Sequence, residues 1–106
     1  MLLPMASMIE KLEFIEEPGG DSDRNLTMYS LSTCAFCKRA IDFLKDRDVA
    51  FRYIHLDQIN PMVKATVKSE LKQKYDNLPV FPVLVINNER ALSGFNEDKW
   101  RTELAL

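Results

Sequence analysis

From residue 25 onward, the sequence alternates between stretches typical of β-strands and stretches typical of amphipathic helices. Residues 25–31 (NLTMYSL) and 80–86 (VFPVLVI) are rich in β-branched and apolar side chains, as strands are. In residues 35–48, apolar side chains instead recur at helical spacing, with Cys37 and Leu44 on one face. Strands that follow one another through a helix pair in parallel by a right-handed crossover. The sequence therefore predicts an α/β fold with helices packed on a sheet.

The other segments complete the predicted order of elements. Residues 49–57 (VAFRYIHLD) form the next expected strand, and Asn60-Pro61 is a helix start, because the missing N–H of proline is harmless there. Asn87-Asn88 predicts a tight hairpin turn, since asparagine tolerates positive φ. Asn96 is the expected N-cap of the last helix. Together these elements predict a β-α-β-α-β-β-α arrangement with a four-stranded mixed sheet flanked by helices.

Residues 1–24 differ in character from the rest of the chain. The stretch LEFIEE within residues 12–17 is compatible with a short edge strand. The PGGDSDRN stretch that follows interrupts regular structure with a proline and two glycines. We expect residues 1–24 to form an N-terminal extension, either a tail or an added edge strand, and residues 25–106 to form the domain proper.

Composition and charge argue against several classes of function. The chain has 106 residues, a length that suits one small domain, and a formal net charge of −2, which gives no reason to expect nucleic acid as a partner. The N-terminal stretch MLLPMASMIEKLEF contains no long apolar run, so we expect neither a signal peptide nor a membrane-spanning segment. We expect a monomeric protein of the cytoplasm.

The two cysteines of the chain, Cys34 and Cys37, lie three residues apart in the stretch LSTCAFCKRA. In the predicted fold, Cys34 falls where the first strand meets the first helix, and the unpaired N–H groups and dipole of a helix N-terminus favour an anion such as a thiolate. Cys37 falls on the apolar face of that helix, so we expect it to be the more buried thiol. Close cysteine pairs in the cytoplasm are typically catalytic or metal-binding. We predict that Cys34 attacks a substrate disulfide and that Cys37 releases the product.

Two alternatives to this interpretation stay open at the level of sequence. A structural zinc site needs four ligands, and one chain offers two cysteines and a single histidine, His55. A metal or iron–sulfur site would therefore require two chains that each contribute one cysteine pair, and we expect no metal on the single chain. The second alternative is an adaptor that binds a partner through residues 1–24.

Three landmarks in this order resemble the glutaredoxin branch of the thioredoxin fold: YSLSTCAFC after the first strand, FP before the third, and SGF before an acidic helix start. The resemblance covers residues 25–105. It implies a cis peptide bond before Pro82, Cys34 as the nucleophile, and a disulfide oxidoreductase that serves electron transport and cell redox homeostasis. The substrate-binding residues expected around the cysteines are Leu31, Thr33, Phe36, Phe81, Pro82, Ser93, Gly94 and Phe95.

Departures from the family pattern bear on the electron donor. Glutaredoxins that use glutathione usually carry a basic residue where this chain has Leu31, and Gly-Gly where it has Ser93-Gly94. Because Leu31 cannot pair with a carboxylate of glutathione, we expect weakened glutathione binding. The Ser-Gly-Phe motif resembles glutaredoxin-like hydrogen donors of ribonucleotide reductase, which take electrons from thioredoxin-type reductases. The expected substrates are disulfide-containing proteins or glutathione mixed disulfides. The expected donor is an upstream reductase or glutathione as a co-substrate, with no bound cofactor.

Overall fold

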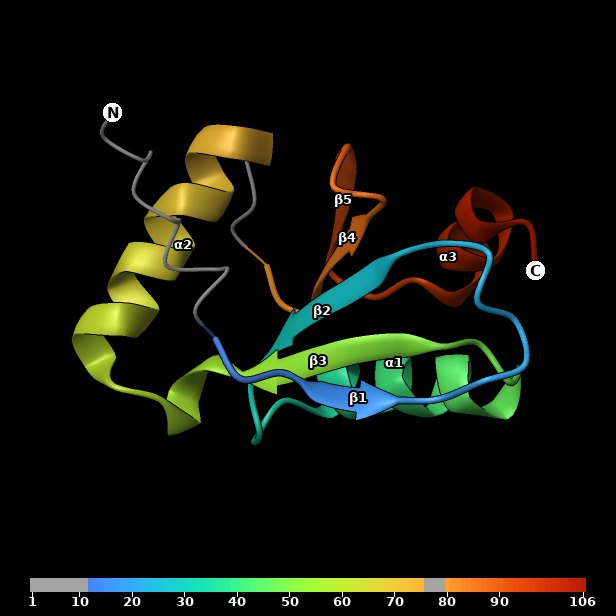
Figure 1. Ribbon diagram of the computed structural model, residues 1–106, viewed down its shortest axis with the longest axis horizontal. Coiled ribbons are helices and arrows are strands. Elements are labelled where there is room, and N and C mark those ends of the chain that lie inside the picture. Colours follow the sequence, from blue (N-terminus) through green and yellow to red (C-terminus); the bar gives the residue numbers. More distant parts are fainter. Residues whose placement is uncertain (1–11, 76–79) are drawn as a thin grey trace, which may run out of the picture.

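A mixed five-stranded sheet forms the centre of the computed structural model, which describes residues 12–75 and 80–106 (Figure 1). The spatial order of the strands is β1-β3-β2-β4-β5. The pair β2–β3 is parallel, as the predicted crossover requires, and the other pairs are antiparallel. The strands are β1 (Ile15–Glu17), β2 (Leu26–Ser30), β3 (Phe51–His55), β4 (Val83–Ile86) and β5 (Arg90–Ser93).

Helices cover both faces of this sheet. The helices are α1 (Ala35–Asp46), α2 (Pro61–Tyr75) and α3 (Glu97–Leu104), with a short 3-10 turn, η2 (Leu56–Gln58), between β3 and α2. Residues of α1 and α3 pack with one side of the sheet in a first core cluster, which contains Leu44 and Trp100. Residues of α2 pack with the other side in a second cluster, which contains Leu71. The α/β class and the predicted order of helices and strands from residue 25 are confirmed.

The number of strands differs from the prediction, because the sheet has five strands and not four. The additional strand is β1, which pairs antiparallel with β3 so that Ile15 lies opposite Tyr53. Phe14, just before β1, contacts Tyr29 edge-on at 5.9 Å between ring centroids, and the Arg52 guanidinium lies 4.2 Å from the Phe14 ring. A strand of three residues is too short for side-chain periodicity to distinguish it from a tail, so the sequence left both choices open.

The segment between β1 and β2 also packs more closely than its glycines and proline suggest. Asp21 forms an isolated parallel bridge with Val49, in which the Asp21 N–H donates to Asp48 O at 2.9 Å and the Ala50 N–H donates to Asp21 O at 2.8 Å. At Gly19, a Cβ atom would lie 2.6 Å from the Ala50 nitrogen. The segment therefore lies against the loop that leads into β3.

The predicted caps and turn are confirmed. The Asn60 side chain accepts a hydrogen bond from the Met62 N–H at 2.8 Å, and the Asn96 side chain accepts one from the Lys99 N–H at 3.0 Å. Asn87 and its neighbour Asn88 both have positive φ, 54° and 57°, in the turn between β4 and β5. Over the described residues, no helix has the length and apolar character needed to cross a membrane.

Candidate functional site

Cys34 is the N-cap residue of α1, at the carboxyl end of β2. Its Sγ accepts a hydrogen bond from the Cys37 N–H at a sulfur–nitrogen distance of 3.2 Å, the contact that serine and aspartate side chains make at helix starts. The Cys34 side chain is partly exposed, so a substrate can reach it. The N-terminus of α1 therefore donates a backbone N–H to a sulfur atom that is partly exposed to solution.

Cys37 lies in the first turn of α1 and is only 1% exposed. Burial raises the pKa of the Cys37 thiol to about 12, and a hydrogen bond to Cys34 acts in the same direction. The Leu31 N–H lies 3.5 Å from Cys37 Sγ and partly offsets this increase. Both cysteines are free thiols. The structure thus separates an accessible sulfur from a shielded, protonated one, as their places on the predicted helix indicated.

The turn after β3 contacts the loop that carries Cys34. Ser30 and His55 are opposite each other in the parallel pair β2–β3, and Ser30 Oγ lies 2.7 Å from His55 Nδ1. Two residues beyond the end of each strand, the Ser32 N–H donates to Asp57 Oδ1 at 2.8 Å and the Ser32 hydroxyl donates to Asp57 Oδ2. The sequence analysis did not identify Ser32 or Asp57 as part of the site. Ser32 and Asp57 each lie two positions after the paired residues Ser30 and His55, and this equal spacing could have indicated that they lie close together.

The Phe81–Pro82 peptide bond is cis, as the resemblance implied. Tyr29 pairs with Val83 between β2 and β4, so Pro82 lies at the same end of the sheet as the cysteine loop. The Ser93 hydroxyl donates to Val80 O at 2.8 Å and accepts from the Val80 N–H at 3.2 Å. The Gly94 N–H donates to Val80 O and Pro82 O, at 3.0 and 2.8 Å. Ser93 and Gly94 therefore hold the segment that precedes β4, and their expected contact with substrate stays a prediction.

The aromatic residues expected around the cysteines occupy different environments. Phe36 is 54% exposed beside the cysteines, and Phe81 is half-buried against the second core cluster with the Lys68 ammonium 5.8 Å from its ring. Phe95 instead packs edge-on against Phe43 and Trp100, at 5.5 and 5.0 Å between ring centroids, on the first core cluster.

Two further expected substrate contacts lie in the loop itself. Leu31 packs partly buried against the second core cluster, and Thr33 is exposed immediately before Cys34. The substrate-binding roles of these residues stay predictions.

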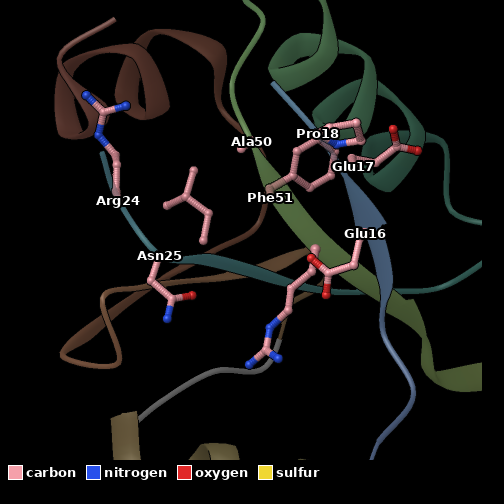
Figure 2. Close-up of a pocket in the computed structure, with 9 residues that line it drawn as sticks. Glu16, Glu17, Pro18, Arg24, Asn25, Ala50 and Phe51 are labelled. Carbon is pink, nitrogen blue, oxygen red and sulfur yellow. The ribbon is translucent and has the colours of Figure 1, made fainter. Parts of the chain in front are cut away.

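A cavity of about 430 Å³ lies at the opposite end of the sheet, where β2 and β3 begin (Figure 2). Several of its charged groups already have partners. Arg24 forms an ion pair with Asp21 at 2.9 Å, Glu17 lies 3.6 Å from the Lys45 ammonium, and Arg52 Nε donates to Thr27 Oγ1. The residues that line this cavity are Glu16, Glu17, Pro18, Arg24, Asn25, Leu26, Ala50, Phe51 and Arg52. Neither Cys34 nor Cys37 lines this cavity.

No cluster of three or more histidine, cysteine, aspartate or glutamate side chains suited to a metal ion occurs within residues 12–75 and 80–106. A metal site at the cysteines would have to combine residues of two chains. A Cys-x-x-Cys pair at the start of a helix, on a sheet with a cis-proline at the same end, defines a protein of the thioredoxin fold.

Comparisons with known proteins identify a family within the thioredoxin fold. The glutaredoxin family model matches residues 26–91. The solved glutaredoxin from Methanosarcina mazei Go1 has a TM-score of 0.75 to this structure and 29% sequence identity, over 88% of each chain. The solved methanoredoxin from Methanosarcina acetivorans has a TM-score of 0.74 and 28% identity, over 86% of this chain and 95% of its own. The glutaredoxin from Archaeoglobus fulgidus has a TM-score of 0.66 and 29% identity, over 77% and 87%.

This chain belongs to the glutaredoxin family. A comparison with curated proteins finds no match. Glutaredoxins are thiol–disulfide oxidoreductases, and the chain is an enzyme of this kind.

Proposed function

We propose that the protein reduces disulfides by a dithiol mechanism in which Cys34 is the nucleophile and Cys37 the resolving thiol. The observation that carries this proposal is the contrast between the two sulfurs. Cys34 Sγ is partly exposed and accepts the Cys37 N–H at 3.2 Å, whereas burial holds the Cys37 thiol protonated at neutral pH, with a pKa of about 12. The nucleophile in disulfide exchange is a thiolate, and backbone N–H groups stabilise that form.

Two exchange steps complete the reaction. The Cys34 thiolate attacks one sulfur of the substrate disulfide; that bond breaks, and the other sulfur leaves as a thiolate that takes up a proton. Cys37 then loses its proton and attacks Cys34 Sγ, so the mixed disulfide breaks and the second substrate sulfur leaves. The substrate gains two electrons and two protons, and the protein keeps a Cys34–Cys37 disulfide. An external dithiol or reductase must return two electrons before the next cycle.

The proposed donor is a thioredoxin-type reductase rather than glutathione, in a reducing compartment such as the cytoplasm. Leu31 carries no charge to meet a glutathione carboxylate, and its side chain packs against the second core cluster. The Ser93 hydroxyl is already bonded to both polar groups of the Val80 backbone. Disulfide-containing proteins are the proposed substrates.

A coupled turnover assay tests this proposal. The protein is supplied with a small disulfide and either thioredoxin reductase or glutathione with its reductase, and NADPH oxidation is followed. We expect turnover with thioredoxin reductase that is at least about tenfold faster than with glutathione, because a lost ion pair to a ligand carboxylate is commonly worth that factor. Faster turnover with glutathione would refute the choice of donor.

Cysteine variants test the roles of the two sulfurs in the same assay. Cys34→Ser is expected to abolish turnover, because no thiolate remains at the N-terminus of α1. Cys37→Ser is expected to form the mixed disulfide once and then stop, which mass spectrometry detects as a covalent adduct. Full turnover by Cys34→Ser would refute the mechanism.

A further inference from the structure

The loop between β2 and α1, residues 31–34, is held from the side by the turn that follows β3. The parallel register places Ser30 beside His55, so residues two positions beyond these strands reach the same edge of the sheet. There the Ser32 N–H donates to Asp57 Oδ1 at 2.8 Å, and the Ser32 hydroxyl donates to Oδ2 of the same carboxylate. Both oxygens of Asp57 therefore accept hydrogen bonds from one residue of the cysteine loop.

These bonds matter because the loop has few other attachments. The Cys34 N–H donates to Leu31 O at 3.2 Å within the loop, and the Leu31 N–H reaches Cys37 Sγ of α1. The Ser32 side chain is exposed, so packing does not fix its position. Within the described part of the chain, Asp57 is the one residue outside the loop and α1 that hydrogen-bonds to residues 31–34.

The Asp57 carboxylate is well suited to this attachment. The Ser32 hydroxyl, followed by the Ser32 N–H, holds the pKa of Asp57 below its ordinary value, so the group is ionised at neutral pH. Hydrogen bonds to an ionised acceptor are stronger than those between neutral groups. The carboxylate lies on η2, which begins directly after β3 and is anchored by the fully buried Leu56.

We propose that Asp57 is a positioning residue: its carboxylate fixes Ser32 and thereby holds Cys34 at the N-terminus of α1, where Cys34 Sγ accepts the Cys37 N–H. Asp57 contacts neither sulfur through a hydrogen bond and acts through the loop. The inference rests on the proposed function for the importance of Cys34 as the reacting group.

The test measures how fast iodoacetamide alkylates Cys34 in a Cys37→Ser background, where Cys34 is the single thiol. Without the carboxylate, the loop holds Cys34 Sγ less firmly at the Cys37 N–H, so the hydrogen bond that supports the reacting sulfur is weakened. We expect Asp57→Ala to slow alkylation at neutral pH roughly five- to tenfold, the factor that one or two lost hydrogen bonds correspond to. Asp57→Asn, whose amide oxygen still accepts from the Ser32 N–H, is expected to stay within about twofold of the parent rate.

Two more variants complete the experiment. Ser32→Ala removes the hydroxyl but keeps the backbone bond and the charge, and is expected to slow alkylation roughly two- to threefold. Asp46→Ala is the matched control, because it removes an exposed carboxylate at the far end of α1 and is expected to leave the rate unchanged. Circular dichroism checks that each variant is folded.

The positioning role would be refuted if Asp57→Ala reacts at the parent rate or faster, since faster alkylation would show that Asp57 acts through its negative charge, which disfavours an anionic sulfur nearby. If Asp57→Ala does not fold, an unchanged rate in Ser32→Ala refutes the role and a slowed rate supports it. Alkylation needs no disulfide substrate. A failed turnover assay therefore refutes the proposed function alone, whereas equal alkylation rates refute the positioning role alone.

Discussion

At the scale of single residues, the site depends on two sulfur atoms that share a helix start but not an environment. The sequence predicts which of the two cysteines is buried. Helical spacing puts Cys37 on the apolar face with Leu44 and leaves Cys34 at the N-cap. The contacts of Ser32 and Asp57 could not, since they join positions 25 residues apart and depend on the register of two strands. Ser93 was expected at the substrate, and only the fold shows that its hydroxyl binds Val80.

The buried Cys37 thiol is expected to make stability fall in alkali. Its pKa of about 12 in the folded protein lies above the ordinary value of 9.0. Below the ordinary value, both states hold the proton and stability is unaffected. Between the two values the unfolded chain loses the proton and the folded chain keeps it, so the free energy of unfolding falls by at most about 1.4 kcal/mol per pH unit.

Urea unfolding of the reduced protein from about pH 8 to about pH 11 measures this effect. Cys37→Ala is the comparison, because it lacks the thiol but keeps the buried Tyr29, whose pKa is also raised by burial. The free energy of unfolding of the parent protein is expected to fall more steeply with pH than that of Cys37→Ala. Parallel curves would contradict the assignment.

At the scale of elements, the parts of the fold with a clear sequence pattern were predictable, and the N-terminal strand was not. The caps at Asn60 and Asn96 and the turn at Asn87-Asn88 follow from local hydrogen bonding and backbone preference, which a sequence displays directly. The strand β1 is stabilised by its pairing with β3, a contact between segments more than 30 residues apart. Such a contact leaves no local signal in three residues.

The two adjacent glycines after β1 are expected to respond differently to substitution. A Cβ at Gly19 would meet backbone atoms of Asp48, Val49 and Ala50 at 2.6–2.7 Å, and these atoms cannot move without disturbing the loop into β3. At Gly20 the nearest obstacle is the Asp48 carboxylate, the flexible end of a side chain. Gly19→Ala is therefore expected to lower the free energy of unfolding by about 1–3 kcal/mol, and Gly20→Ala to change it by less than about 0.5 kcal/mol.

Chemical unfolding of the two variants side by side gives both values. Equal stability of Gly19→Ala and Gly20→Ala would show that the segment between β1 and β2 does not lie against Asp48–Ala50 in solution.

At the scale of the whole molecule, the central strands join two core clusters. Met28 of β2 belongs to the first cluster with α1 and α3, and Tyr29, the next residue, belongs to the second with α2. Leu84 and Val85 of β4 divide in the same way. A helix cannot leave either face without exposing side chains of strands that also support the other face. The two clusters are therefore expected to unfold together.

The fluorescence of the single tryptophan, Trp100, measures the unfolding of the first cluster, because Trp100 is fully buried in it. Leu44→Ala in the first cluster and Leu71→Ala in the second are each expected to lower the free energy of unfolding by about 2–5 kcal/mol. Both are expected to shift the fluorescence and circular dichroism transitions together. Met62→Ala, at an 80% exposed position, serves as the control. A fluorescence midpoint unchanged by Leu71→Ala would show that the clusters unfold independently.

The pairing of β1 with β3 also bears on solubility. An uncovered border strand offers a row of free N–H and C=O groups to other molecules, and proteins protect such borders with short, charged strands. In the described sheet, β1 provides this protection with Glu16 and Glu17. Without it, the five residues of β3, with Phe51 and Tyr53 among them, would form the border. A chain that lacks β1 is therefore expected to self-associate along the exposed side of β3.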